Sequence, residues 1–204
     1  LYSAGYREAA IDNFKRAIEA QPNFEPAYFN MGNVYKELGK LDAAVLSYKQ
    51  AVKIKPDYAM AYLNMGVVQK EKGDLDTSID CYNQAIKIQP DFAPNYLNMG
   101  TAQLEKGFLD EAQENFEYAI KIKQDYAEAY SNIGLVHKEK GDIVAAIRNQ
   151  KKAIKIRPDY AEAHCNLSFA LLNQGELREG LDENEWRWRN PNFLSKERHF
   201  LQPM

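Results

Sequence analysis

The sequence repeats with a period of 34 residues, and this period constrains the fold more than any other feature. Glycine recurs six times at that step, at Gly5, Gly39, Gly73, Gly107, Gly141 and Gly175. Four further rows follow the same period. One row is proline and one is tyrosine: Pro22, Pro56, Pro90 and Pro158; Tyr28, Tyr62, Tyr96 and Tyr130. The other two are a second glycine row and an alanine row: Gly32, Gly66, Gly100 and Gly134; Ala17, Ala51, Ala85, Ala119 and Ala153. A fixed period of this length indicates a repeat architecture.

Each period predicts two amphipathic helices separated by a short turn. Between Pro26 and Leu38 the apolar residues follow helical spacing, and Gly39 then permits the left-handed geometry that ends a helix. The next helix begins near Asp42, whose charge suits a helix N-terminus, and Pro56 prevents its continuation. Neither helix can bury its apolar stripe alone. We therefore predict an all-α solenoid of stacked helical hairpins.

Small residues at fixed positions predict how each hairpin closes. A glycine inside a helix costs about 1 kcal/mol relative to alanine. Its recurrence at Gly32 and the equivalent positions therefore indicates a close approach of the second helix. Small residues on that second helix complete the contact, at Ala44, Ser78, Ala112 and Ala146. The bulky Tyr48, Tyr82 and Phe116 are expected to wedge between hairpins.

Composition and charge exclude several classes of function. The chain has 26 basic and 29 acidic residues, a net charge of −3, so binding to nucleic acid through phosphates is disfavoured. The two cysteines favour a reducing compartment, and we expect a cytoplasmic protein. The longest apolar stretch, Tyr58 to Leu63, is far too short for a membrane span.

Eight recurring positions identify a resemblance to the tetratricopeptide repeat (TPR) family: Tyr28, Met31, Gly32, Tyr35, Ala44, Tyr48, Ala51 and Pro56. The resemblance covers about residues 1–189 and implies a right-handed superhelix. It divides the chain into a partial repeat at 1–24, full repeats at 25–58, 59–92, 93–126 and 127–160, a degenerate repeat at 161–189, and an extension at 190–204. Gly180 and Asn184 depart from the motif in the degenerate repeat, and Gln124 and Gln150 depart more mildly.

Both ends of the resemblance carry expectations. Leu1 aligns with Tyr35, so residues 1–5 would end a first helix, residues 6–19 would form a second helix without its partner, and the chain would be a fragment of a longer array. The segment from Glu185 to Pro203 is similar to the junction in bacterial proteins whose TPR array precedes a glycosyltransferase-like domain. The plainer interpretation is that Trp188 caps the last core and Trp186 packs beside it.

No motif for catalysis, a cofactor or a metal is present. The sequence has no CxxC, HExxH, calcium loop or phosphate-binding glycine loop. His164 and Cys165 are adjacent, and neighbouring residues of a helix do not share a face. His137 is expected to serve packing, and Asp74 and Asp76 recur at helix starts, as capping residues do. We therefore predict a non-enzymatic chain.

A sixth row of residues predicts a binding groove. Asparagine recurs without a gap on the first helices, at Asn30, Asn64, Asn98, Asn132 and Asn166, although asparagine is a weak helix former. A carboxamide both donates and accepts hydrogen bonds, so one asparagine per repeat could clamp the backbone of an extended peptide. This ladder resembles that of O-linked N-acetylglucosamine transferase. The same face would include Phe29, Leu63, Leu97, Asn33, Lys36, Lys70 and Lys138.

The alternative is that each asparagine bonds a neighbouring helix of the solenoid. We expect instead that the row is largely free of intramolecular partners. The favoured function is a non-catalytic scaffold that holds an extended protein segment, with self-association through the solenoid ends as a further possibility. The alternative functions are the substrate-recognition region of a larger glycosyltransferase-like protein and, less favoured, a helical-repeat reader of RNA.

Overall fold

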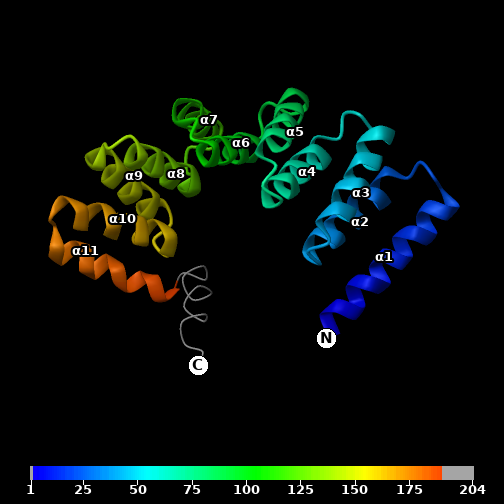
Figure 1. The fold of residues 1–204 in the computed structure, drawn as a ribbon, viewed down its shortest axis with the longest axis horizontal. Helices are drawn as coiled ribbons and strands as arrows, with labels where there is room; N and C mark the ends of the chain where they lie inside the picture. The colour runs from blue at the N-terminus through cyan, green and yellow to red at the C-terminus, as the bar shows by residue number, and fades with distance from the viewer. Residues whose placement is uncertain (1, 190–204) are drawn as a thin grey trace. The chain divides into compact units, whose positions relative to one another are not determined.

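Paired helices make up the computed structural model, which describes residues 2–189 and the side chains of residues 5–188 (Figure 1). The first helices of the hairpins are α2 (Glu25–Glu37), α4 (Ala59–Glu71), α6 (Ala93–Lys106), α8 (Ala127–Glu139) and α10 (Ala161–Gln174). The second helices are α1 (Tyr2–Ala20), α3 (Leu41–Ile54), α5 (Leu75–Ile88), α7 (Leu109–Ile122), α9 (Ile143–Ile156) and α11 (Leu177–Asn184), and α11 leads into a 3-10 helix, η1 (Glu185–Arg189). Residues 2–189 contain no strand, so the all-α prediction is confirmed over this range.

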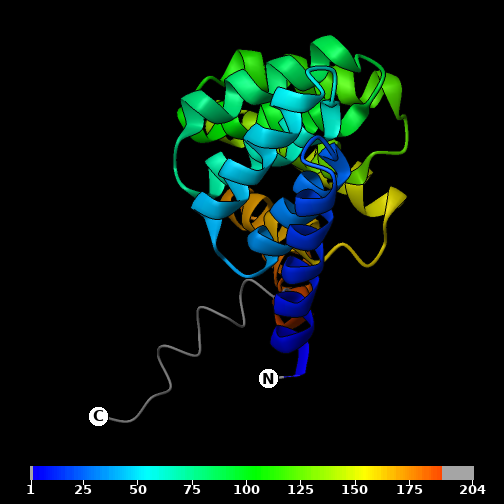
Figure 2. The same cartoon turned by 90° about the vertical axis from the view of Figure 1, so that its right-hand side faces the viewer.

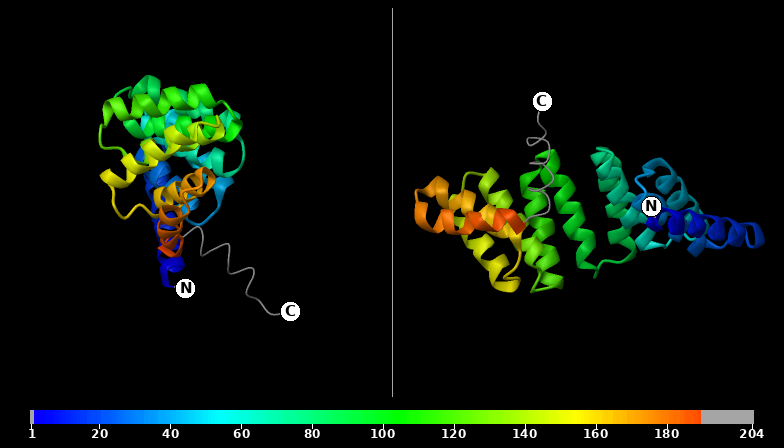
Figure 3. Two further views of the ribbon diagram at one scale, coloured as in Figure 1. Left: turned by 90° about the vertical axis from the view of Figure 1, so that its left-hand side faces the viewer. Right: turned by 90° about the horizontal axis from the view of Figure 1, so that it is seen from below.

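The chain divides after Gly107 into two compact units. In unit 1 (residues 1–107) α1 lies beside α2, and the helices from α2 to α6 each contact the next one along the chain (Figure 2). In unit 2 (residues 108–204) the helices from α7 to α11 do the same, and η1 packs on α10 and α11 (Figure 3). Each unit is therefore built by contacts between helices that are near neighbours in sequence, as in a solenoid of hairpins.

A glycine in left-handed backbone geometry ends five of the helices. Gly39 has φ of +68°, its N–H donates to the carbonyl of Lys36, and the next N–H, from Lys40, donates to Tyr35. Positive φ recurs at Gly73, Gly107, Gly141 and Gly175. Gly5 is different, because α1 runs through it without a break. The predicted turn at residue 5 is therefore wrong. No atom outside its own helix lies within 4 Å of a Cβ placed on Gly5, so no packing forces a turn there.

The hairpins close on glycine as predicted. A Cβ added to Gly32 would lie 2.6 Å from Cε1 of Tyr48, and a Cβ added to Gly66 would lie 2.6 Å from Cε1 of Tyr82. Both tyrosines are completely buried. Ser78 strengthens the second of these hairpins, because its hydroxyl donates to the carbonyl of Gly66 over 2.8 Å.

A polar pair replaces the aromatic residue in the α8–α9 hairpin. Gln150 stands where other repeats carry an aromatic ring, and its Nε2 would lie 2.6 Å from a Cβ on Gly134. Its Nε2 donates to the carbonyl of Ser131 and its Oε1 accepts from the Ser131 hydroxyl, both over 2.9 Å. Gln150 and Ser131 are each only 1% exposed, so the departure from the motif is compensated inside the same hairpin.

In the degenerate repeat, the two helices meet through small residues whose positions are reversed relative to the motif. Ser168 replaces the usual glycine of the first helix, Gly180 replaces the small residue of the second, and the Ser168 hydroxyl donates to the Gly180 carbonyl over 2.7 Å. Trp186 of η1 stacks on the ring of His164, with centroids 4.0 Å apart and planes 3° apart. Trp188 is 46% exposed, so the prediction that it caps the last core is wrong. The tryptophan that packs on the last hairpin is Trp186, through its stack on His164.

The apolar face of α1 is only partly covered. Ala10, Phe14 and Ile18 are half-buried, as expected for a second helix without a first helix against it. Ile11, on the same helix, is only 5% exposed. It lies at the position of Val45, which faces the following hairpin, and α1 packs on α2 in the same way.

Candidate functional site

The asparagine row lies on the first helices, where the predicted groove would run. Within unit 1, α4 contacts both α2 and α6, and within unit 2, α8 contacts α10. Asn30 is exposed. The other four members of the row are half-buried: Asn64, Asn98, Asn132 and Asn166.

One member of the row belongs to a hydrogen-bonded cluster between α2 and α4. Nδ2 of Asn64 donates to Oδ1 of Asn33 over 2.8 Å, and the hydroxyl of Tyr48 donates to the same oxygen over 2.8 Å. Burial raises the pKa of Tyr48 above its ordinary value, so this phenol stays protonated and remains a donor. Asn33 and Asn64 therefore connect two neighbouring hairpins.

The remaining members of the row differ in their surroundings. Nδ2 of Asn98 donates to the carbonyl of Pro94, one turn back in its own helix, over 2.8 Å. Nδ2 of Asn166 is enclosed but has no hydrogen-bond partner among the described residues. The expectation that the row is largely free of intramolecular partners is therefore wrong for Asn64 and Asn98. Sequence periodicity places a side chain on a helix face, but it does not show which polar group of the next helix lies opposite.

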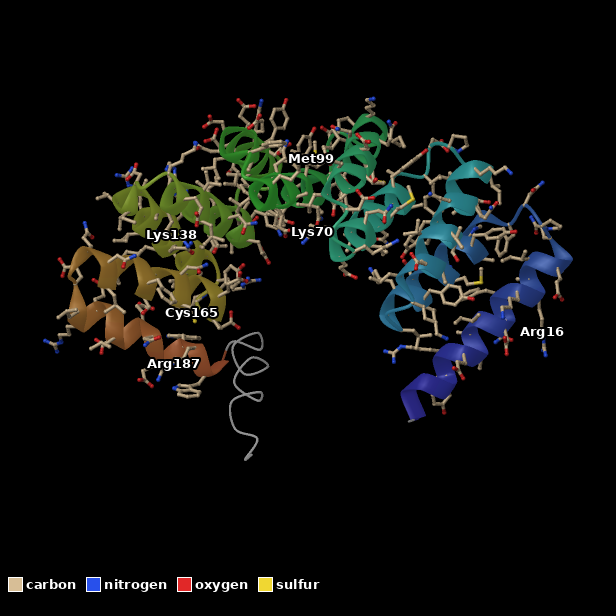
Figure 4. The ribbon with its side chains drawn as sticks, in the orientation of Figure 1. Arg16, Lys70, Met99, Lys138, Cys165 and Arg187 are labelled. Carbon is tan, nitrogen blue, oxygen red and sulfur yellow. The ribbon has the colours of Figure 1, made fainter. Side chains whose placement is uncertain are left out.

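Two of the apolar residues assigned to the groove serve packing between hairpins. The ring of Phe29 lies 4.9 Å from that of Tyr58 and 6.0 Å from that of Tyr48. Leu63 is 6% exposed, in a core that also contains Met99 (Figure 4). These two residues do not form an open surface. Leu97 is half-buried.

The predicted lysine row is largely neutralised by carboxylates. Lys70, on α4, pairs with Glu105 of α6 over 2.9 Å (Figure 4). Lys138, on α8, pairs with the adjacent Glu139 over 3.2 Å. Lys36 is half-buried. Because Lys70 and Lys138 are paired with carboxylates at partly exposed positions, they offer little net field to a charged ligand.

Three titratable residues occupy structural positions: His164, Cys81 and Asp74. Nε2 of His164 lies 2.9 Å from the carbonyl of Pro158, and Nδ1 contacts the Glu183 carboxylate. Burial raises the pKa of the Cys81 thiol to about 11, which suppresses the thiolate. Asp74 accepts a hydrogen bond from the Thr77 N–H, which confirms its capping role.

Among residues 2–189, no group of three or more His, Cys, Asp or Glu side chains is arranged to hold a metal ion. Over the same residues, no helix combines the length and apolarity needed to cross a bilayer.

Comparison with known families decides the classification. The sequence model of the TPR repeat matches five overlapping stretches, residues 1–39, 32–73, 70–107, 104–141 and 136–175. The chain belongs to the TPR repeat family. A comparison with curated protein sequences gives no match.

Solved structures share the TPR fold at low sequence identity. MamA is 24% identical with a TM-score of 0.68, and the match covers 83% of this chain and 95% of MamA. YrrB, described as a TPR protein with an unusual peptide-binding site, is 19% identical with a TM-score of 0.67 over 85% of this chain and 89% of its own. TTC0263, a thermophilic TPR protein of Thermus thermophilus, is 23% identical with a TM-score of 0.65 over 84% and 94%. These similarities concern the TPR fold.

Most of the glycosyltransferase-like junction lies outside the described residues, because it extends through Pro203. The same holds for the extension at 190–204.

Proposed function

We propose that this TPR chain is a non-catalytic scaffold that binds an extended segment of a protein partner along its first helices. The observation that carries this proposal is the gapless asparagine row on those helices. Its members have hydrogen-bonding capacity in reserve. A carboxamide offers two N–H donors and an oxygen with two lone pairs. Nδ2 of Asn98 donates one hydrogen bond, to the carbonyl of Pro94 in its own helix, which leaves a second N–H and the oxygen for a ligand.

Geometry supports an extended ligand. Packed helices lie about 8–10 Å apart, and an extended chain advances about 3.3 Å per residue. One asparagine per repeat would then meet about every third residue of the bound segment. YrrB, which shares the fold, is described as having a peptide-binding site. That site supports peptide binding as a function of this architecture.

The test uses peptides selected by display against the full chain. Asn98→Ala should weaken the selected peptide about fivefold, the equivalent of about 1 kcal/mol for one hydrogen bond. The melting temperature should stay unchanged or rise slightly, because alanine is the better helix former. Asn149→Ala is the matched control, since Asn149 makes the same bond to a carbonyl one turn back but lies on a second helix. Equal weakening by both variants would contradict the proposal.

The alternative is that the array selects substrates for a larger glycosyltransferase-like protein. The resemblance of the asparagine row to that of O-linked N-acetylglucosamine transferase and the segment from Glu185 onward support it. Sequencing the gene past Met204 distinguishes the two, because a transferase domain would begin there. We also propose a cytoplasmic location, because a chain with only two cysteines favours a reducing compartment.

We also propose that the end helices associate with a second copy. Leu181 of α11 is 57% exposed, whereas Val45, at the equivalent position of α3, is 6% exposed in the core where α3 meets α4. Leu177 of α11 is 63% exposed. Sedimentation equilibrium should show dimers that Leu181→Glu removes. A monomer at all concentrations would contradict this proposal.

A further inference from the structure

The asparagine row contains one unsatisfied donor. Nδ2 of Asn166 is shielded from solvent and has no hydrogen-bond partner among the described residues. An enclosed donor without an acceptor costs about 1–3 kcal/mol, and such groups are rare in folded proteins. Asn166 as a whole is half-buried, so rotation of its carboxamide about χ2, a broad torsion, can bring Nδ2 toward the surface.

The repeat explains why this donor is unsatisfied. Asn64 donates to Asn33, which stands 31 residues earlier on the preceding first helix. The residue 31 positions before Asn166 is Leu135, whose side chain has no acceptor. The residue 31 positions before Asn98 is Val67, which also has no side-chain acceptor. Nδ2 of Asn98 donates instead to the carbonyl of Pro94 in its own helix. Asn166 makes neither of these bonds.

The surroundings of Asn166 indicate the chemistry of an acceptor. Phe169 lies three residues further along α10, so the two side chains are neighbours on the helix surface. Its ring is 69% exposed, an unusual exposure for so large an apolar side chain. Leu135, on the contacting helix α8, is half-buried. The α8–α10 face of unit 2 thus combines an unpaired N–H donor with two accessible apolar side chains.

We propose that this face is the anchoring subsite for the bound segment, a conclusion that rests on the proposed function. Asn166 donates to a main-chain carbonyl of the ligand, and Leu135 and Phe169 cover the adjacent large apolar side chain. Asn64 has a different role, because its donor already joins two hairpins through Asn33. The subsite therefore prefers a leucine-like or phenylalanine-like residue at one position of the extended segment.

The first test uses a small probe on the full chain. N-acetyl-leucine N-methylamide carries one apolar side chain between two amide groups, and N-acetyl-glycine N-methylamide carries the amides alone. In NMR titrations, the side-chain amide signals of Asn166 should shift saturably with the leucine probe, and the glycine probe should bind at least fivefold more weakly. Asn166→Ala and Phe169→Ala should each weaken the leucine probe at least fivefold, whereas Asn149→Ala should not.

Stability measurements separate binding from folding. Asn166→Ala should leave the melting temperature unchanged or raise it, because it removes an unpaired enclosed donor. Asn64→Ala should lower it, because it breaks the bond to Asn33. Unchanged affinity of the leucine probe in Asn166→Ala would overturn the subsite, and so would a melting temperature lowered as much as in Asn64→Ala.

The second test distinguishes the subsite from the proposed function. A display-selected peptide that is weakened by Asn98→Ala but unaffected by Asn166→Ala overturns the subsite and leaves the scaffold function in place. Selection of no peptide, together with binding of the leucine probe at Asn166, supports the subsite and overturns the extended-segment function. Weakening of the selected peptide in both variants supports both.

Discussion

At the scale of single residues, the second-helix aromatic ring leaves no space for a side chain on the glycine opposite. Gly32→Ala would place a Cβ 2.6 Å from the Tyr48 ring, so we expect a loss of about 1–3 kcal/mol in the free energy of unfolding. Gly5→Ala is the control, because Gly5 is also helical but has nothing within 4 Å. That variant should gain up to about 1 kcal/mol. Urea unfolding measures both, and equal effects would show that packing against Tyr48 is irrelevant.

The thiol of Cys81 should be nearly inert at neutral pH. Burial raises its pKa from 9.0 to about 11, so thiolate forms only as the pH approaches 11. In Cys165→Ser, alkylation of Cys81 by iodoacetamide at pH 8 should be about a hundredfold slower in the native state than in urea. The protonated thiol is favoured by the fold, so its contribution to stability is complete below pH 9 and is lost as the pH rises through 11. Equal alkylation rates with and without urea would contradict this.

Some of these residue roles follow from sequence and others do not. The glycine row predicted the close approach of the second helix, because a costly glycine at a fixed helical position needs a close neighbour. It did not predict that Tyr48, expected between hairpins, would be the side chain that faces Gly32. The bond between Asn64 and Asn33 was missed. Its two members stand 31 residues apart, three residues short of the 34-residue period, and only the packing of α2 on α4 brings them together. Phe29 and Leu63 were misplaced for the same reason.

At the scale of helices, the α8–α9 hairpin should accept the residue pair of the α4–α5 hairpin. Repeat 59–92 carries Leu63 and Tyr82 where this hairpin carries Ser131 and Gln150. Gln150→Tyr alone leaves the buried Ser131 hydroxyl without its partner, which should cost about 1–3 kcal/mol. Ser131→Leu alone leaves the Gln150 carboxamide short of one bond. The double variant should be more stable than either single one.

A thermodynamic cycle of the four proteins measures this coupling. Additive losses would show that the two positions act independently, contrary to their two hydrogen bonds. The sequence alone identified Gln150 as a departure from the motif. It could not identify Ser131 as the compensating residue, because serine at a position that elsewhere holds phenylalanine or leucine also fits an exposed site.

Helix boundaries were predictable where a local signal fixes them. Gly39 and its equivalents end helices through their own backbone geometry, and Asp74 caps the helix that follows it. The ends of the chain lack such signals. Gly5 alone could not impose a turn on α1, and η1 is held by the stack of Trp186 on His164, a contact that no periodic pattern encodes.

At the scale of the whole molecule, contacts between near neighbours make stability local. Each helix packs chiefly on those beside it in sequence, and the chain divides into two compact units. In such an array stability is approximately a sum of repeat and interface terms, and unfolding departs from a single two-state transition. A destabilised hairpin should therefore weaken the helices it touches and leave distant helices unchanged.

Hydrogen exchange on Gly32→Ala tests this locality. Amides in α2 and α3 should exchange faster because their packing is strained, and those in α4 should follow because α4 contacts both helices. Amides in α9 and α10, which belong to unit 2, should keep their wild-type rates. Gln150→Tyr provides the reciprocal experiment, with faster exchange in α8, α9 and α10 and unchanged rates in α2 and α3. Uniform acceleration across the chain in either variant would mean that the two units unfold as one, and local packing would then not govern stability.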